Sequence, residues 1–577
     1  MFTHVNRSGG REYLRILETY YDEHGRHKQR VVANLGRLDQ IAGGLDKLAA
    51  AIARFADKRL LLAEQIRAVA AVPWGPVLLA RRLWDELGLG SIIRSRCRSH
   101  HRDFDVAESA FVLVANRLIH PGSEHALARW LENTYVPDAA GSRWLPRWLP
   151  AGKVSKEQRV RVEPDQLQQW YRTLDALLAG KSGIEQDIFR RVCDLFSQKV
   201  DMVFYDVTSV YFERRRPKGL RRHGYSRDGR PRNVQVVLGV VMANGWPIAH
   251  HVFPGNTADK ATLQTAISDV DARFGLRRVL VVGDRGMVTE ENLQSLNAGG
   301  RQMRYLMGVP GRHSDESARV LAKLDGKAWQ KVDDANRVQQ VVLDDPAVRY
   351  FVVASDERYA YEQDLRQRDM TATAADLQKL AEAVRTGKIK QPARIAARAQ
   401  HALGEHHGHR YFTWEAPPDG GFTFRQDEEK LKAEQLHEGK YIVKTDDPGL
   451  VPVEAVGIYK QLSDVEWAYR DLKDVIRMRP IYHKTDGRAL AHLFVATLAL
   501  FLKRTLEHRL AQAGLPDTPT AAFEAMGSVG VSVLDLNGEQ RLLTSCGGPD
   551  ARRILTALGI REIDPPQPQK VTEMSHR

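Results

Sequence analysis

The chain has 577 residues, of which 43% are hydrophobic and 27% charged, and these ordinary proportions exclude a disordered, collagen-like or coiled-coil protein. Its length exceeds that of one compact core, so several structural units are expected. The cysteines number only 3, which is typical of a reducing compartment and excludes a cysteine zinc cluster. The net charge of +13 favours a polyanionic partner such as nucleic acid, with a merely basic protein as the alternative.

Secretion and membrane insertion are not indicated. The longest apolar run, residues 490–502, is interrupted by His492 and is shorter than the ~20 residues that span a bilayer. No segment near the N-terminus combines a basic start, an apolar stretch and a cleavage site. We therefore predict a cytoplasmic protein without a membrane partner.

The N-terminal part is predicted to begin with strands and to continue with helices. Residues 1–43 are expected to form a β-hairpin, because apolar and polar residues alternate on both sides of a turn at Gly25. Residues 44–135 have a helical period and are predicted to be a helical region that binds DNA. Two of its helices, 106–120 and 123–133, fit either a helix-turn-helix that reads DNA or a pair that only packs.

A segment of different composition follows. Residues 136–164 contain prolines at 137, 146, 150 and 164 and little periodicity, so we predict a linker or long loop. Residues 165–200 are predicted to form two helices, 165–178 and 184–198, which lead into the next domain.

Residues 201–310 are predicted to form the first part of an α/β core. β-branched runs dominate this region, and a predicted helix at 289–296 precedes the last of them. Strands before and after a helix indicate a mixed α/β sheet. The runs are 202–212, 233–242, 278–283 and 305–309.

The rest of the chain is predicted to interrupt this core and then complete it. Residues 311–440 are polar, with their own strand, helical stretches and turns, and are expected to be an inserted domain. Residues 441–510 are expected to complete the core with a strand, a long helix at 453–477 and an apolar helix. Residues 511–577 are predicted to hold a helix and a hairpin with its turn at Asn537-Gly538.

Two aspartates lie where an active site would need carboxylates. Asp206 lies inside the apolar run 202–212, where an ionised carboxylate is costly unless it is paired or binds a metal. Asp284 directly follows the run 278–283, and α/β sheets bind ligands at the carboxyl ends of their strands. Each aspartate alone also fits a cap or a turn.

A third candidate, Glu466, shares a predicted helix face with Tyr459, Leu462 and Lys473. At 100° per residue, these side chains fall within a stripe of about 60°. The alternative is a surface ion pair between Glu466 and Arg470, one turn away, worth only ~0.3–0.5 kcal/mol.

Three aspartates near Glu466 could be mistaken for the third carboxylate. Asp464 and Asp471 lie about 160° and 140° from Glu466 on a continuous helix, so both are expected to point to solvent. Asp474 is closer in angle but lies about 12 Å further along the helix axis.

A basic loop separates the first two predicted strands. Within residues 214–232 all charged side chains but one are lysine or arginine. Such a run is usually a solvated loop, but beside an acidic metal site it suits a phosphodiester substrate. The candidates for DNA binding in this loop are Arg214, Arg215, Arg216, Lys218, Arg221, Arg222, Arg227 and Arg230.

An ordered set of motifs resembles the DDE transposases of bacterial insertion sequences. The branch that it resembles has a β-rich insertion between the second aspartate and the glutamate. The hairpin end at 31–36 and the tail around 536–538 are also similar, so the resemblance covers most of the chain. The motifs are Tyr205-Asp206-Val207-Thr208, the stretch 223–231, the turn 253–259, Gly283-Asp284-Arg285-Gly286-Met287, and Tyr459 with Glu466 and Lys473.

The resemblance implies a ribonuclease-H-like core in which Asp206, Asp284 and Glu466 hold two divalent metal ions. Oxygen ligands of this kind select Mg²⁺ or Mn²⁺. Two such ions activate a water or a DNA 3′-hydroxyl and stabilise the leaving oxygen in an in-line displacement.

The resemblance also implies that Tyr459 and Lys473 contact DNA around the cleaved strand. The family has an arginine where this chain has Leu462, so that contact is missing or is supplied by Lys460 or Arg470.

We therefore predict a transposase that cleaves and joins double-stranded DNA at the terminal inverted repeats of its element and at target DNA. It is expected to act as a homodimer in the DNA complex and to be associated with the nucleoid. The alternative is a DNA-binding regulator or domesticated relative with an inactive nuclease-like core, which would not need three carboxylates. A histidine-based metal hydrolase using 250–251 or 406–409 lacks the helical spacing of known zinc motifs.

Overall fold

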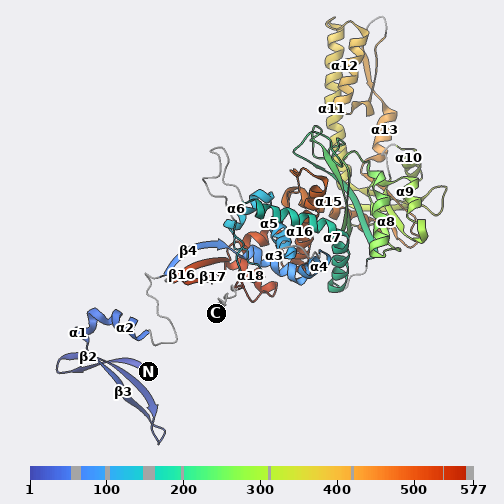
Figure 1. Ribbon diagram of the computed structural model, residues 1–577. Coiled ribbons are helices and arrows are strands. Elements are labelled where there is room, and N and C mark those ends of the chain that lie inside the picture. Colours follow the sequence, from blue (N-terminus) through green and yellow to red (C-terminus); the bar gives the residue numbers. More distant parts are fainter. Residues whose placement is uncertain are drawn as a thin grey trace. The chain divides into compact units, whose positions relative to one another are not determined.

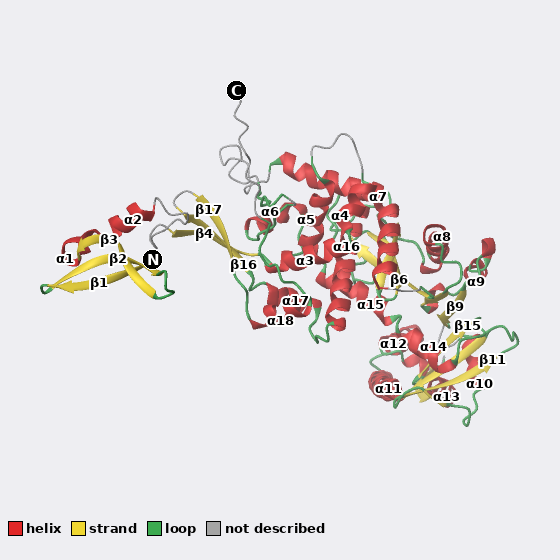
Figure 2. Cartoon of the chain, turned by 90° about the horizontal axis from the view of Figure 1, so that it is seen from below, coloured by secondary structure: helices red, strands yellow, loops and turns green. Residues whose placement is uncertain are grey.

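The computed structural model describes most of the chain (Figures 1 and 2). The described residues form two compact units, one of residues 1–72 with 531–545 and one of the remainder. Each unit is described by itself below. The described ranges are 1–53, 66–97, 104–138, 140–146, 163–196, 200–309, 314–417, 421–536 and 539–566.

The first unit begins with a three-stranded antiparallel sheet in the order β1-β2-β3. The expected hairpin is formed by β2 and β3, and β1 adds a third strand before it. Gly9 and Gly10, both with positive φ, make the two-residue turn between β1 and β2. The elements are β1 (Phe2–Ser8), β2 (Arg11–Tyr21), β3 (His27–Arg37), α1 (Leu38–Ile41), η1 (Ala42–Gly44) and α2 (Leu45–Ala53).

A second sheet of the first unit pairs distant parts of the chain in the order β17-β16-β4. The prediction that 44–135 is helical throughout is wrong for β4 (Ile66–Pro73), because pairing in this sheet overrides an alanine-rich local sequence. β16 (Gly530–Leu536) and β17 (Glu539–Thr544) are the two antiparallel strands of the predicted hairpin. The turn predicted at 537–538 lies outside the described residues.

The second unit contains a bundle of helices around the apolar helix α16 (Figure 2). Among the described residues, α16 is the helix long and apolar enough to cross a membrane, but here it is buried against α5, α7 and β7. The helices are α3 (Gly75–Glu86), α4 (Leu89–Arg96), α5 (Val106–Ile119), α6 (Glu124–Glu132), α7 (Pro164–Phe196), α16 (Asp486–Gln512), α17 (Pro519–Met526) and α18 (Pro549–Ala557).

The two helices predicted between 165 and 198 are one continuous helix, α7, so the expected break is wrong. Gly180 and Gly183 are sites of close packing against α4. A Cβ on Gly180 would lie 3.0 Å from Sγ of Cys97, and one on Gly183 would lie 2.8 Å from the Arg96 side chain. These glycines let two helices approach each other, and they do not end either one.

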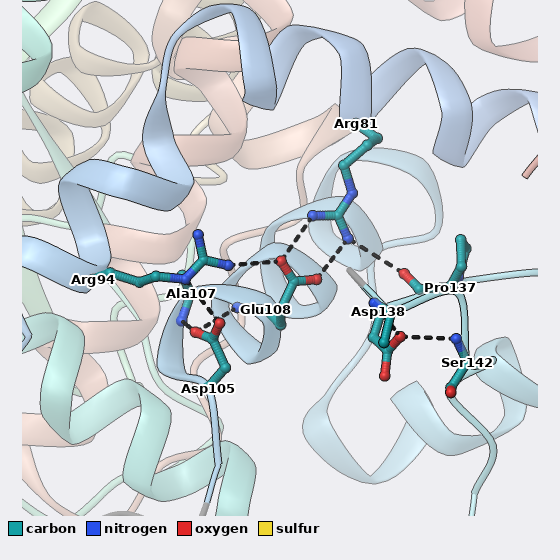
Figure 3. A network of polar contacts seen from close by, with 9 residues as sticks. Arg81, Arg94, Asp105, Ala107, Glu108, Pro137, Asp138 and Ser142 are labelled. Atoms are coloured by element: carbon teal, nitrogen blue, oxygen red, sulfur yellow. Dashed lines mark hydrogen bonds and ion pairs between the residues drawn. The ribbon is translucent and has the colours of Figure 1, made fainter. Parts of the chain in front are cut away.

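A buried carboxylate fastens three helices of the bundle together (Figure 3). Glu108 of α5 accepts hydrogen bonds from Arg81 of α3 at 3.0 Å and from Arg94 of α4 at 3.1 Å. Arg94 also pairs with Asp105, which caps the N-terminus of α5. α5 is buried along nearly its whole length, whereas α6 keeps one exposed face, so both interpretations of this helix pair stay open.

The core of the second unit is a nine-stranded sheet in the order β10-β11-β12-β15-β9-β8-β5-β6-β7. β5, β8 and β9 are parallel and the other pairs antiparallel, so the predicted mixed α/β sheet is confirmed. Helix α8 packs on its buried centre. The strands are β5 (Met202–Tyr211), β6 (Gln235–Ala243), β7 (Trp246–Pro254), β8 (Leu280–Gly283), β9 (Arg304–Gly308), β10 (Gln330–Lys331), β11 (Asn336–Val342), β12 (Arg349–Ser355) and β15 (Lys440–Thr445).

The segment 311–440, predicted to be a β-rich inserted domain, contains both strands and helices. β10, β11 and β12 belong to the core sheet, because β12, buried on both faces, pairs with β15. The segment that departs from the sheet between β12 and β15 is mostly helical, and α11 runs for 30 residues beside α12 (Figure 1). Its elements are α11 (Asp356–Arg385), α12 (Pro392–Glu405), η7 (Gly408–Arg410), β13 (Phe412–Glu415), β14 (Thr423–Gln426) and α13 (Glu428–His437).

Short elements complete the second unit. The helix predicted over 453–477 is divided into α14, α15 and a π-helical turn, η8. The remaining elements are η4 (Asp259–Ala261), α8 (Leu263–Phe274), η5 (Arg285–Met287), α9 (Glu290–Ser295), η6 (Ala298–Gly300), α10 (Asp315–Ala322), α14 (Pro452–Lys460), α15 (Ser463–Arg470) and η8 (Asp471–Val475).

Candidate active site

Strand register places the two candidate aspartates side by side. β5 and β8 are parallel, and their last paired residues are Tyr205 and Gly283. Asp206 and Asp284 are the next residue on each strand. Asp206 is half-buried within β5, whereas Asp284 is exposed where β8 ends and η5 begins.

The third candidate reaches the same place from another element. Glu466 lies on α15, which packs against β5. Together with Asp206 and Asp284 it lines a cavity of about 590 Å³. The fold therefore brings to one cavity three carboxylates that are far apart in the sequence.

The helix face predicted around Glu466 is only partly retained. Tyr459 on α14 and Leu462 at the start of α15 line the same cavity as Glu466, but Lys473, in the π-helical turn, does not. Asp471, which was expected to point to solvent, is buried and pairs with Lys503 at 2.8 Å. A wheel drawn for one continuous helix fails here because the helix is interrupted before Ser463 and again after Arg470.

A buried tyrosine, Tyr469, links the glutamate's helix to the aspartate's strand. Its hydroxyl donates a hydrogen bond to the carbonyl oxygen of Asp206 and accepts one from the backbone N–H of Val240 at 3.0 Å. Tyr469 lies within the predicted helix 453–477, but no local pattern signals a hydrogen bond to a distant strand.

The carboxylates create an electrostatic demand for a cation. Burial raises the pKa of Asp206 to about 7, the backbone N–H of Val207 lowers it, and the neighbouring charge of Asp284 raises it. A bound cation stabilises the ionised form of a carboxylate that burial and a neighbouring negative charge would otherwise keep protonated. The residues present therefore fit a divalent metal ion held by oxygen ligands.

Comparisons with known families identify the chain. Residues 199–502, more than half of its length, match the family described as the transposase DDE domain, and residues 3–65 match the IS1634 family transposase N-terminal domain. The chain is a DDE transposase of an insertion sequence. It is accordingly a metal-dependent enzyme that acts on DNA.

A solved structure similar to this transposase is the piggyBac transposase synaptic complex with hairpin DNA. The TM-score is 0.34 and the identity 8%, over 80% of this chain and 82% of that chain. No curated protein matches the transposase.

Cationic side chains line the same cavity of the transposase as the carboxylates. Arg358 lies in the first turn of α11, and Lys440 begins β15, so the chain on both sides of the helical segment contributes to the site. The sequence could not reveal them, because only the pairing of β12 with β15 brings them here. The cationic residues of the lining are Arg285, Arg358, Lys440 and Lys460.

The basic loop of the transposase is exposed at its start and anchored further on. Arg214, Arg215 and Arg216 are exposed, as is Lys218. Arg221 is instead buried, and its guanidinium donates to the carbonyl oxygen of Lys484 at 3.0 Å. Arg222 is half-buried against the carbonyl oxygen of its neighbour, and Arg230 is exposed.

Two predicted DNA contacts of the transposase are engaged in ion pairs. Arg227 donates to both carboxylate oxygens of Asp259, at 2.7 and 2.6 Å. Lys473 donates to the buried carboxylate of Asp228 at 2.8 Å, and Arg479 shares that carboxylate at 2.7 Å. Lys473 thus fixes the tip of the basic loop to the π-helical turn.

Arg470 and the neighbouring Trp467 form an exposed pair beside the third carboxylate. The guanidinium of Arg470 lies over the ring of Trp467, 4.3 Å from its centroid. Both side chains are exposed on α15, next to Glu466.

Proposed function

We propose that the transposase cleaves and joins DNA strands at the terminal inverted repeats of its element, with Asp206, Asp284 and Glu466 as metal ligands. The supporting observation is the convergence of these carboxylates, from β5, β8 and α15, on one cavity with a cationic wall. The adjacent parallel strands and the packed helix are consistent with a ribonuclease-H-like core.

Two Mg²⁺ or Mn²⁺ ions are the proposed cofactors, because all three ligands are hard carboxylate oxygens. When bound, the ions polarise the scissile phosphate and lower the pKa of the attacking hydroxyl. Asp206 and Asp284 hold one edge of the site through their strands. Glu466 closes it from α15, and Tyr469 fixes the spacing between the two elements.

The cations around the cavity would hold the DNA backbone. We assign phosphate contacts at the site to Arg285, Arg358 and Lys440, and contacts outside it to the exposed cationic side chains of the basic loop and α15. The outer set is Arg214, Arg215, Arg216, Lys218, Arg230 and Arg470. Tyr459, which lines the cavity, would contact the cleaved strand, and Lys473 would act indirectly through the loop.

The cellular setting follows from the family and from the need to join two DNA ends. Membership of a transposase family fits a soluble cytoplasmic protein. We propose association with the nucleoid and a homodimer that bridges the two ends of the element.

A cleavage assay tests the proposal. Full-length transposase is incubated with Mg²⁺ and a labelled duplex that carries one end of its element. Asp284→Ala and Glu466→Gln are expected to bind this duplex but not to nick it, because each loses a metal-binding charge. Asp464→Asn, which alters an exposed carboxylate two residues from Glu466, is the matched control and should nick normally.

The outcomes separate the alternatives. Nicking by Glu466→Gln together with inactivity of Asp464→Asn would contradict the assignment of the third ligand. Tight DNA binding without metal-dependent nicking by the parent protein would favour a regulator with an idle core.

A further inference from the structure

The helical module between β12 and β15, residues 356–437, carries an unbalanced positive surface where α11 ends and α12 begins. Residues 383–404 contain five lysines and arginines but no aspartate or glutamate. They include the end of α11, the turn after it and most of α12. The rest of α11 mixes acidic and basic residues, so the excess of positive charge is confined to this end of the module.

Three cations of this surface have no carboxylate to offset them. Lys388, Arg394 and Arg398, called the tip cations below, are exposed and form no ion pair with a described residue. The first turn of α12 has no acidic residue, so the positive end of its helix dipole adds to their potential. Elsewhere on α11, exposed cations pair with carboxylates three or four residues away, as Arg368 does with Asp364 at 2.7 Å. The tip cations are therefore free to bind an anion.

The tip cations lie on a surface that a polyanion can approach closely. Arg394 and Arg398 are one turn apart and share a face of α12. Ala393 and Ala397, next to them, are also exposed, so small side chains separate the two guanidinium groups. Ile395 belongs to a buried core that α12 shares with α11, which fixes the orientation of the helix. The charged face of α12 is thus held toward solvent.

Helix α11 sets the distance of this surface from the carboxylates. Arg358, in its first turn, lines the cavity of Asp206, Asp284 and Glu466. Arg385, in its last turn, is about 40 Å further along the helix at 1.5 Å per residue. α11 and α12 run side by side away from the sheet (Figure 1). A distance of about 40 Å corresponds to roughly 12 base pairs of B-DNA.

We propose that the tip cations bind the phosphate backbone of duplex DNA about one helical turn, or roughly 12 base pairs, from the bond that is cleaved. The inference rests on the proposed function, because the distance is counted from the carboxylates at which strands are cut. A duplex that runs from the cavity alongside α11 stays straight over this distance, since its persistence length is about 150 base pairs. Phosphate contacts of this kind fix the orientation of the DNA and carry no sequence information.

The test measures binding of the full-length transposase to two duplexes, without divalent metal so that the DNA stays intact. Both duplexes carry one end of the element. The long one extends roughly 20 base pairs on either side of the cleavage site, beyond the proposed contact, and the short one only about 6. The tip variant replaces Lys388, Arg394 and Arg398 by Ala. On the long duplex it should bind more weakly, and its salt slope should fall by ~0.9 for each lost contact. On the short duplex it should bind as the parent does.

The matched control replaces Arg368, Lys379 and Arg385 by Ala. It removes the same charge from the same module, but each of these side chains already pairs with a carboxylate of α11. Its salt slope on the long duplex should therefore change much less than that of the tip variant. Thermal melting of each variant checks that it is folded.

Parent-like binding of the long duplex by the tip variant would overturn the inference, as would equal losses on both duplexes or an equal loss in the control. Parallel cleavage assays with Mg²⁺ separate this inference from the proposed function. If Asp284→Ala is inactive and the tip variant binds the long duplex like the parent, the tip surface alone is wrong. If Asp284→Ala nicks like the parent, the proposed function fails, and the distance counted from the carboxylates fails with it.

Discussion

At the scale of single residues, the separation between Asp206 and Glu466 depends on one hydroxyl group. Tyr469 lies three residues after Glu466 and bonds to the backbone of Asp206 itself, so a shift of α15 along β5 would break this bond first. Metal-dependent phosphoryl transfer is sensitive to ligand placement, and a misplacement of about 1 Å can cost on the order of 100-fold in rate.

Tyr469→Phe is therefore predicted to lower the single-turnover cleavage rate roughly 10- to 100-fold. Its unfolding free energy should fall by about 1–3 kcal/mol for each of the two buried backbone groups that lose the hydroxyl. Mn²⁺ binding, measured by calorimetry, should weaken as well. Tyr350→Phe is the control, because it loses the bond from a buried hydroxyl on β12 to Glu316 at 2.8 Å, away from the site. A parent-like rate and parent-like Mn²⁺ affinity in Tyr469→Phe would show that the hydroxyl does not position the site.

The raised pKa of Asp206 predicts how stability changes with pH in the absence of metal. The pKa is about 7 in the folded protein, against an ordinary value of 3.8 for an aspartate. Between these values the folded protein binds more protons than the unfolded chain, so stability falls as the pH rises from about 4 to 7. The loss is on the order of 2–4 kcal/mol. In EDTA, Asp206→Asn should abolish this component of the melting curves, and Mg²⁺ should raise the melting temperature of the parent only. A parent protein in EDTA as stable at pH 8 as at pH 5 would contradict the prediction.

At the scale of elements, the helix that carries Glu466 shows what a local pattern can predict. The helical period over 453–477 is present in the sequence. The apolar residues Ile458, Val465, Leu472 and Ile476, which recur at helical spacing within it, are buried. The two interruptions of this helix, before Ser463 and after Arg470, accompany contacts with residues that are distant in the sequence. Tyr459 packs against Gly308, where a Cβ would lie 2.6 Å from its hydroxyl, and Asp471 turns inward to Lys503. No residue within the helix signals either contact.

The residues of the candidate site likewise include some that the sequence could predict and some that it could not. Asp206 and Asp284 were predictable because each lies in or directly after an apolar run, and runs of that kind form adjacent strands in α/β sheets. Arg358 and Lys440 were not predictable, because they reach the cavity through pairing of strands on either side of a long helical segment.

The exposed start of the basic loop is predicted to bind the DNA backbone without reading bases. Replacing Arg214, Arg215 and Arg216 by Ala should weaken binding to terminal-repeat and random duplexes about equally. The salt dependence should fall by up to ~0.9 per lost phosphate contact. Titrations at several salt concentrations measure both quantities. Arg222→Ala, which alters a half-buried arginine of the same loop, should change them less. An effect confined to the terminal repeat would contradict this prediction.

At the scale of the whole second unit, one buried carboxylate joins the helical bundle to the catalytic sheet. Glu185 of α7 accepts hydrogen bonds from Lys181 at 3.0 Å and from Arg273 of α8 at 2.6 Å, and it lies 2.9 Å from Nδ1 of His250 on β7. These cations hold the pKa of Glu185 well below its usual range despite burial. Sequence patterns predicted both regions but not their connection.

Glu185→Gln is predicted to destabilise the unit by up to about 3–5 kcal/mol, because the half-buried cations Lys181 and Arg273 lose this buried carboxylate. Urea unfolding followed by tryptophan fluorescence measures the change. Glu382→Gln removes a carboxylate that pairs with Arg385 on the exposed surface of α11 and should have little effect. Comparable stability of the two variants would mean that the Glu185 cluster does not hold the bundle to the sheet.

The pairing of β12 with β15 has an evolutionary consequence. Ala354 and Lys440 are register partners, so the chain leaves the sheet and returns to it at neighbouring positions. The whole segment between these two residues connects two strands that would otherwise form a simple hairpin. A gene could therefore acquire, exchange or lose this module by recombination at one locus, while the strands that carry Asp206 and Asp284 kept their register. The chemistry and the accessory surface can thus diversify at different rates within a single polypeptide.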